Sequence, residues 1–533
     1  MTGDWGPVDK LVGRAEALAG AWGARARAST SVGQERAILR LFGVTGVDAG
    51  GRPLAGTTVD RWLASDPRGL GAGIALPFAM ALLEYDLEPQ QLALDVASGA
   101  IDLALEGELL AERDRRAIAE VEASRLAGLA VERIDAQRTV RRETIDMLGE
   151  ASRPWLGVTL REPDVVAALE EATSLIGSGI DLIRIEVPIG RELADRLADA
   201  GLEVPVWQPR VTAPRGAEPD LSEPAPTGSQ RALTHLRRVA DRAAARRRAY
   251  VRLATVVPAL GAPEGAVVAA FERIDVIASD AMAEIVADGV EPDRALADHA
   301  FAHRLARRAG SAILVGSGPL VVAPDLTTGV PSDPATRSGR ALALQLLGIM
   351  LARSDGLAAD QIIAGALPPW VTDEPSPGAR AIAEVAVRRA LFPGLPLGFV
   401  EPPVGPERSP LWPWVQAAAA IHAGDTALVL RMGEGPAEEV MATAQASRAA
   451  ARVASDVAQA AQPGSLRGVA LDHAKGMIAA AQSTLDRLAD HGWRTVSGDP
   501  PAGARARHAA VRDVVTERTE SFDPFAAALG KRG

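Results

Sequence analysis

Short, largely apolar runs alternate with amphipathic stretches from Trp155 onward. Such runs are typical of strands buried in a parallel sheet, and the stretches between them show the helical period of about 3.6 residues. We predict strands at Leu156–Leu160, Leu182–Val187, Tyr250–Thr255, Arg273–Ala278, Ala312–Val315, Gln361–Ala364, Leu397–Val400 and Ala427–Leu430. A parallel sheet of that size can close on itself and remove its edges, so the pattern predicts an α/β fold with a (β/α)8 TIM-type barrel.

Both flanks of this region have a helical pattern. We expect a helical accessory region at 1–150, the TIM-like barrel at 151–433, and a C-terminal helical region and tail at 434–533. Ser31 lies three residues before Gln34 and is a candidate N-cap. The stretch Glu112–Arg142 is favoured as a solvated helix over a binding surface.

One further apolar run, Val204–Gln208, is a possible ninth strand. It precedes the proline- and glycine-rich segment 209–228, which we predict to be a long loop, either a lid or disordered.

The amino-acid composition excludes several kinds of functional site. The chain has 533 residues, of which 47% are hydrophobic and 23% charged, as in ordinary globular proteins. The absence of cysteine excludes disulfides, a thiolate nucleophile and iron–sulfur clusters. No apolar run reaches the roughly 18 residues of a membrane span, and the start MTGDWGPVDK has no basic region followed by an apolar one. We therefore expect a cytoplasmic protein with no membrane partner.

The net charge of −11 argues against a nucleic-acid partner, because phosphate binding needs an electropositive surface. The arginines at 237, 238, 242 and 246–248 are the exception, and their spacing favours the solvated face of a helix over an anion site. Lysine occurs only at Lys10, Lys475 and Lys531, which leaves almost no candidate for covalent attachment of an aldehyde cofactor within this chain.

Several charged residues at predicted strands are candidates for binding. Arg184 and Glu186 share one strand face, as a structural ion pair or with Arg184 holding an anion. Tyr250 and Arg252 also share a face, and a buried Arg252 needs an acid partner such as Asp275 or Asp280.

Other candidates follow strands or lie on a helix. Asp280 comes just after a strand and can contact a ligand or cap a helix, and Gly316-Ser317-Gly318 can bind phosphate or form a plain turn. His299 and His303 have the spacing of two metal ligands, but no third ligand is evident and a surface helix pair is favoured, so we predict no metal site. Neither a Gly-x-Ser-x-Gly nor a Gly-x-x-x-x-Gly-Lys motif is present.

Read together, these segments resemble the large (alpha) subunit of the adenosylcobalamin- and pyridoxal-phosphate-dependent D-lysine 5,6-aminomutases. The resemblance runs collinearly along nearly the whole chain. It rests on blocks at 34–37, 46–48, 155–181, 250–253, 263–264, 272–275, 280, 326–328, 391–393, 396–397, 402–403 and 523–525.

The resemblance implies an isomerase that moves the terminal amino group of lysine to the adjacent carbon. In that family a small beta subunit supplies cobalamin binding and the lysine that binds pyridoxal phosphate, while the barrel of the large subunit holds the cofactor and substrate at its C-terminal rim. This chain has no Asp-x-His-x-x-G motif and few lysines, as that division of labour requires. It implies cofactor-binding positions at Arg252, Asp280, Ser279, Gly190 and Ser317; the catalytic residues are not assigned.

The chain departs from the family where its loops follow the strands. The Arg-Thr-Thr-Gly-Gln-Ser-like run is Val187 to Glu192 here, and Asn-Tyr is Thr255-Val256. These replacements keep two alternatives open: a non-catalytic barrel that scaffolds or regulates a cobalamin-binding partner, and an aminomutase for another amino acid.

Overall fold

A closed barrel of eight parallel strands forms the centre of the molecule. The computed structural model describes residues 8–46, 48, 53–66, 68–151, 155–160, 165–186, 225–257, 260–278, 280–286, 290–316, 333–365, 376–400, 427–431, 468–493, 515–519, 522–525 and 529. The strands are β2 (Trp155–Leu160), β3 (Leu182–Glu186), β4 (Arg252–Val256), β5 (Val276–Ala278), β6 (Ala312–Val315), β7 (Ile362–Gly365), β8 (Leu397–Val400) and β9 (Ala427–Arg431). The predicted (β/α)8 barrel is confirmed, and the possible ninth strand at 204–208 lies outside the described residues.

The barrel closes in sequence order, because β2 pairs with β9 as well as with β3. Its interior is lined by small or branched apolar side chains, as close packing inside a narrow barrel requires. They are Leu182, Ala254, Val276, Leu314 and Ile363, one from each of β3 to β7.

Strand β5 begins three residues later than the sequence predicts. The backbone of Arg273 has φ 54°, which no strand residue adopts. Asp275, the residue before β5, uses its side chain to accept a hydrogen bond from the Tyr250 hydroxyl. The polar residues of the predicted strand therefore belong to the turn that enters it.

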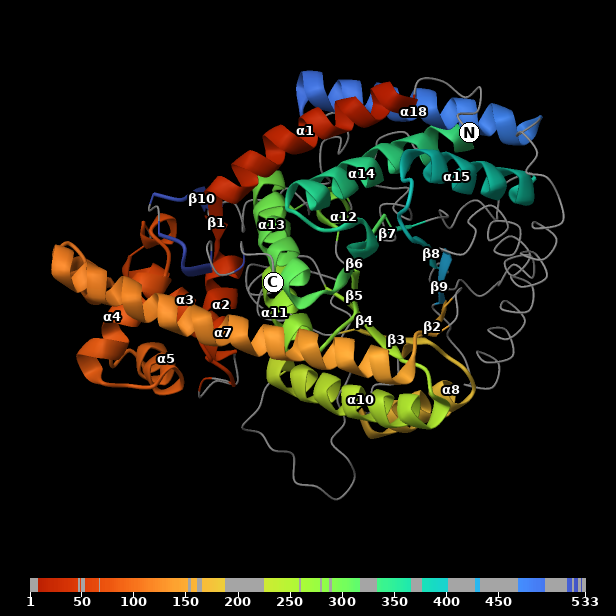
Figure 1. Ribbon diagram of the computed structural model, residues 1–533. Helices are drawn as coiled ribbons and strands as arrows, with labels where there is room; N and C mark the ends of the chain where they lie inside the picture. The colour runs from red at the N-terminus through yellow and green to blue at the C-terminus, as the bar shows by residue number, and fades with distance from the viewer. Residues whose placement is uncertain are drawn as a thin grey trace, which may run out of the picture.

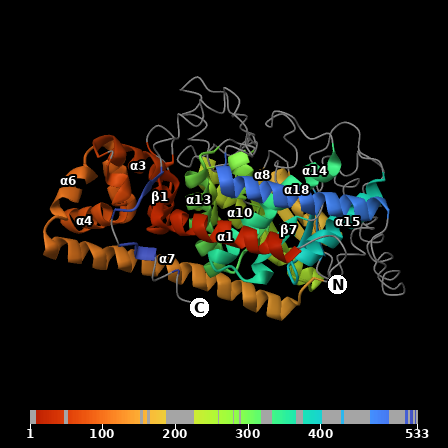
Figure 2. The same cartoon turned by 90° about the horizontal axis from the view of Figure 1, so that it is seen from above.

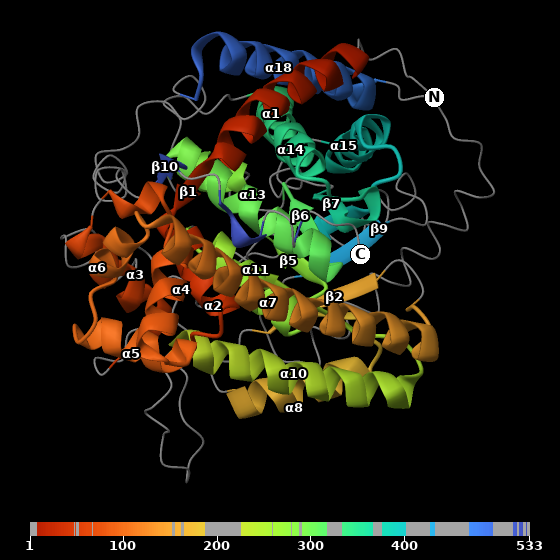
Figure 3. The ribbon, with the colours of Figure 1, turned by 60° about the vertical axis from the view of Figure 1, so that its left-hand side comes forward.

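Helices surround the barrel. In order they are α8 (Val165–Gly177), α10 (Ala225–Arg247), α11 (Ala262–Phe271), α12 (Ala281–Val286), α13 (Pro292–Ala309), α14 (Pro334–Ser354) and α15 (Pro377–Leu391). Helices α8 and α10 lie side by side along one flank (Figure 3). A second layer, α1 (Val8–Ala28) and α18 (Val469–His491), covers α14 on another side (Figure 2).

The remaining N-terminal helices form a separate cluster beside the barrel. It contains α2 (Val32–Leu41), α3 (Leu54–Ser65), α4 (Ala75–Tyr85), α5 (Pro89–Ser98) and α6 (Leu103–Leu109). Helix α7 (Arg113–Leu148) runs from this cluster along the barrel (Figure 1). A two-stranded antiparallel sheet of β1 (Ser29–Ser31) and β10 (Val515–Glu517) brings the tail to the cluster.

Local signals explain parts of this cluster. The Ser31 hydroxyl accepts a hydrogen bond from the Gln34 N–H, which confirms Ser31 as the N-cap of α2. Helix α7 is solvated along much of its length, as predicted, although Arg141 near its end is buried. None of the helices among the described residues is long and apolar enough to cross a membrane.

Candidate functional site

The C-terminal ends of β5, β6 and β7 lie next to one another at the barrel rim. In (β/α)8 barrels chemistry takes place at this end, in the loops that follow the strands. Segments 287–289, 317–332 and 366–375 fall outside the described residues, as do three predicted cofactor-binding residues, Gly190, Ser279 and Ser317.

Asp280 links the ends of two strands. Its Oδ2 accepts a hydrogen bond of 2.8 Å from the Gly316 N–H after β6, and its Oδ1 accepts one of 2.9 Å from the Met282 N–H at the start of α12. Burial raises the pKa of Asp280 against the lowering effect of these N–H donors. The geometry is that of a buried helix cap that also joins β5 to β6.

Gln345 makes the corresponding link between β6 and β7. Its amide nitrogen, reaching in from α14, donates to the carbonyls of Val315 at 3.0 Å and Gly365 at 2.8 Å. Arg388 of α15 donates to the Gln345 Oε1 at 2.9 Å and to the Gly365 carbonyl at 2.8 Å. The sequence signal for Gln345 was its position as one polar residue inside the apolar stretch 341–352.

Arg252 lies at the opposite end of the barrel, as the first residue of β4. Its guanidinium stacks on the Trp155 ring at 3.5 Å and pairs with Glu150 at 2.8 Å. The expectation of Asp275 or Asp280 as its acid partner was wrong. Since β4 has five residues, each advancing about 3.3 Å, Arg252 lies roughly 13 Å along the strand from its C-terminal end.

Asp275 organises the same N-terminal end. It accepts a hydrogen bond from the Tyr250 hydroxyl at 2.9 Å and one from the Leu253 N–H at 2.9 Å, and it lies 3.0 Å from the Arg141 Nε and 3.4 Å from the Arg237 Nη1. Arg237 is therefore buried rather than on the solvated face predicted for the arginine run. Burial, followed by the charge of Asp275, raises the pKa of Tyr250 to about 12.

Arg184 lies on β3 in register with Thr159 of β2 and Ala254 of β4. Its side chain is buried. The side chain of Glu186 lies outside the described residues, so the predicted ion pair and the anion-binding alternative both stay predictions.

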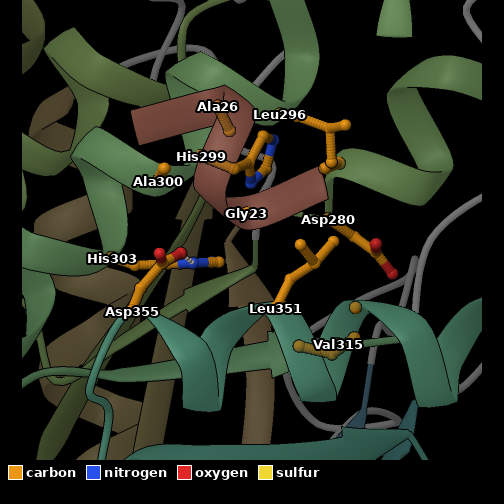
Figure 4. A pocket seen from close by; sticks show the side chains of 12 residues that line it. Gly23, Ala26, Asp280, Leu296, His299, Ala300, His303, Val315, Leu351 and Asp355 are labelled. Carbon is orange, nitrogen blue, oxygen red and sulfur yellow. Dashed lines mark hydrogen bonds and ion pairs between the residues drawn. The ribbon is translucent and has the colours of Figure 1, made fainter. Parts of the chain in front are cut away.

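His299 and His303 are buried, and the prediction of a surface pair was wrong. His299 Nε2 lies 3.0 Å from Glu284 of α12, and His303 Nδ1 lies 2.8 Å from Asp355 after α14. Both rings and Asp280 border a small cavity closed by α1 (Figure 4). Its open space of about 10 Å³ is near the least that one water needs. Among the described residues, no group of three or more His, Cys, Asp or Glu side chains is placed so that it could hold a metal ion.

Comparison with known proteins identifies relatives along most of the chain. A family model described as the D-lysine 5,6-aminomutase TIM-barrel domain of alpha subunit matches residues 4–203 and 223–405. The lysine 5,6-aminomutase alpha subunit of Acetoanaerobium sticklandii is 26% identical over 399 residues, covering 75% of this chain and 71% of that protein. The alpha subunit of Fusobacterium nucleatum is 25% identical over 405 residues, with coverage of 75% and 71%.

Solved structures of lower similarity also align with parts of this chain. Dihydropteroate synthase from Anaplasma phagocytophilum aligns with a TM-score of 0.34 at 14% identity, covering 57% of this chain and 99% of that chain. A Toxoplasma gondii protein described as a putative orotidine-monophosphate decarboxylase aligns with a TM-score of 0.30 at 15% identity, covering 61% and 98%.

Proposed function

Since the chain belongs to the family of D-lysine 5,6-aminomutase alpha subunits, we propose that it is the large subunit of a lysine 5,6-aminomutase-like isomerase. The reaction is a radical 1,2-amino shift that uses adenosylcobalamin and pyridoxal phosphate. The observation that carries the proposal is the family match, which extends from the N-terminal helices through β8.

The described residues do not by themselves fit pyridoxal phosphate. Arg252 lies at the wrong end of the barrel to bind a phosphate at the C-terminal rim, and the two oxygens of Asp280 accept backbone N–H groups. We therefore assign direct contacts with the cofactor to Gly190, Ser279 and Ser317 and to the partner subunit.

The partner in this proposal is a small cobalamin-binding beta subunit, which also supplies the lysine for pyridoxal phosphate. The lysines of this chain support that assignment. Of the three lysines, Lys10 and Lys475 lie within the described residues. Both are exposed, Lys10 on α1 and Lys475 on α18, outside the barrel. With no membrane or nucleic-acid partner, the complex acts in the cytoplasm on a lysine-like amino acid.

A second candidate is a non-catalytic barrel that scaffolds the cobalamin-binding partner. Two observations favour it: the replacement of the family's Asn-Tyr by Thr255-Val256, and the structural use of Arg252 and Asp280. An aminomutase for another amino acid is the third, and the same assay separates all three.

The test is an absorbance titration of the chain, in complex with its small partner, against pyridoxal phosphate. We expect a saturable visible band that shifts when lysine is added. The variant Lys475→Met is the matched control and should leave the band unchanged, since the covalent lysine belongs to the partner.

Other outcomes discriminate between the candidates. A stable complex without a band contradicts the enzyme and supports the scaffold. A band that shifts with a different amino acid but not with lysine keeps the enzyme class and changes the substrate. Loss of the band in Lys475→Met contradicts the assignment of the covalent lysine to the partner.

A further inference from the structure

Side chains from outside the sheet join three consecutive strand ends at the C-terminal rim. Asp280 connects the end of β5 to the residue after β6, and Gln345 connects the last residues of β6 and β7. Arg388 adds a second donor to the last carbonyl of β7. The strand ends are thus connected beyond the ladder hydrogen bonds of the sheet itself.

These contacts add side-chain donors to the last carbonyls of β6 and β7. A carbonyl oxygen has two lone pairs and can accept a side-chain donor in addition to a donor from the sheet. Gln345 and Arg388 are themselves 1% and 3% exposed, so water does not compete for these bonds. A glutamine that bridges two carbonyls fixes the distance between the two strand ends.

The backbone that leaves β6 is shaped around Gln345. Gly316 has φ +79°, a conformation that side-chain-bearing residues rarely adopt, and a Cβ at this position would lie 2.5 Å from the Gln345 Nε2. The direction of the chain after β6 therefore depends on where Gln345 sits.

Arg388 is in turn held by the C-terminal helix. Its guanidinium pairs with Glu384, and the Glu384 Oε1 lies 3.0 Å from the His473 Nε2 of α18. Arg380 Nη1 lies 3.0 Å from the other ring nitrogen of His473. Because an arginine only donates, the Nδ1 accepts, and a neutral His473 carries its proton on Nε2 toward Glu384.

We infer that Gln345 and Arg388 are positioning residues that set the direction in which the chain leaves β6 and β7 into the rim. They act through the strand ends rather than by touching substrate. Only the expected loss of turnover rests on the proposed function. The effect on the strand ends is expected for a non-catalytic scaffold as well.

The chain offers a matched control for Gln345. Gln361 lies at the other end of β7, where its amide nitrogen donates to the carbonyls of Ser311 at 3.1 Å and Ala306 at 3.3 Å. The variants Gln345→Met and Gln361→Met each remove one side-chain amide. The first amide binds at the C-terminal end of β7, and the second lies at its N-terminal end. Any general loss of stability should appear in both.

The experiment measures hydrogen exchange of the full chain and lysine turnover of its complex with the partner. In Gln345→Met we expect faster amide exchange at 312–316 and 362–365 and a fall in kcat of about tenfold to a hundredfold, as for other misplaced active-site groups. Gln361→Met should keep the exchange at Gly316 and the kcat of the wild type.

Arg388→Lys tests the second positioning residue and keeps a charge beside Glu384. A lysine places a methylene group where Arg388 has the Nε that donates to both Gln345 and Gly365, so exchange near Gly365 should rise as in Gln345→Met. Equal exchange at the C-terminal strand ends in all variants and the wild type would overturn the inference. If the wild-type complex turns over no lysine, the proposed function fails, and the exchange comparison still decides the positioning role.

Discussion

Tyr250 and Asp275 show how a single buried pair stabilises the N-terminal end of the barrel. Tyr250 is fully buried and donates its hydroxyl to Asp275, which two arginines also contact. In Tyr250→Phe we expect the free energy of unfolding to fall by about 1–3 kcal/mol, because the carboxylate loses a donor in a water-free site. Chemical denaturation at pH 7 measures this change.

The same tyrosine predicts loss of stability in alkali. Its pKa is about 12 in the folded protein, against 10.0 for a free tyrosine, so its contribution is full below pH 10 and is lost as pH rises through 12. Two pKa units correspond to roughly 2.7 kcal/mol. Tyr250→Phe should lack this loss, whereas Tyr85→Phe, at the half-exposed second tyrosine, should keep it. Identical alkaline unfolding of wild type and Tyr250→Phe would contradict the assignment.

Asp280 predicts a pH dependence in the acid range. Its pKa is raised in the folded state, chiefly by burial, so its contribution is full below the unfolded value of 3.8 and decreases as pH rises through the folded value. An asparagine never ionises, but its single carbonyl oxygen cannot replace both carboxylate oxygens. The unfolding free energy of wild type minus that of Asp280→Asn should therefore fall as pH rises above 3.8. A difference that does not change with pH would contradict the raised pKa of the buried carboxylate.

At the scale of elements, a buried arginine of helix α7 contacts the N-terminal end of the barrel. Arg141 donates to the carbonyls of Ala309 at 2.6 Å and Ile274 at 2.8 Å, and lies against Asp275. In Arg141→Met we expect a loss of about 3–5 kcal/mol, because Asp275 loses a buried partner. The neighbouring Arg142 is exposed, so Arg142→Met should change stability by less than about 0.5 kcal/mol. Thermal and urea unfolding of both variants provide the test.

The strands could be predicted from the sequence because their period differs from that of the helices. All eight predicted runs coincide with barrel strands, and those at 312–315 and 397–400 match at both ends. Runs such as Ala312–Val315 contain only apolar residues between turn signals, which fixes their limits. The start of β5 was predicted wrongly because the positive φ of Arg273 cannot be recognised from the pattern of apolar residues.

The polar contacts at the rim could not be predicted, because they join residues far apart in the chain. His299 and His303 suggest a surface helix, yet α13 is covered by α1, α12 and α14, and each histidine meets a carboxylate from a different element. Gln345 is conspicuous in an apolar helix, but its two acceptor carbonyls lie 30 and 20 residues away. Arg252 lies in a predicted strand, and only the observed strand limits and register place it at the N-terminal end.

At the scale of the whole molecule, the C-terminal tail connects the N-terminal helical cluster to the barrel. Strand β10 pairs with β1, and the following Arg518 donates to Gln34 at 3.1 Å. Asp523 pairs with Arg304 of α13 at 3.2 Å. The division of the chain at residues 150 and 433 stays a prediction. The tail contacts both the N-terminal cluster and the barrel helix α13.

Phe525 is the apolar centre of this connection. It is fully buried, and its ring lies 5.9 Å from that of Phe42 in the N-terminal cluster. Phe525→Ala should lower the free energy of unfolding by about 3–5 kcal/mol, because it leaves a cavity in a buried apolar cluster. Phe522→Ala, at a partly buried position in the same segment, should cost less.

Hydrogen exchange shows which part of the molecule depends on that contact. In Phe525→Ala we expect faster exchange in α2 and α4, which pack around Phe42 and Phe78, and unchanged exchange in the strands of the barrel. The local response follows because the barrel has its own interior and closes without the tail. Faster exchange in the cluster and the strands together would mean that they unfold as one unit. Unchanged exchange in the cluster would instead mean that α7 and α11 suffice to hold it.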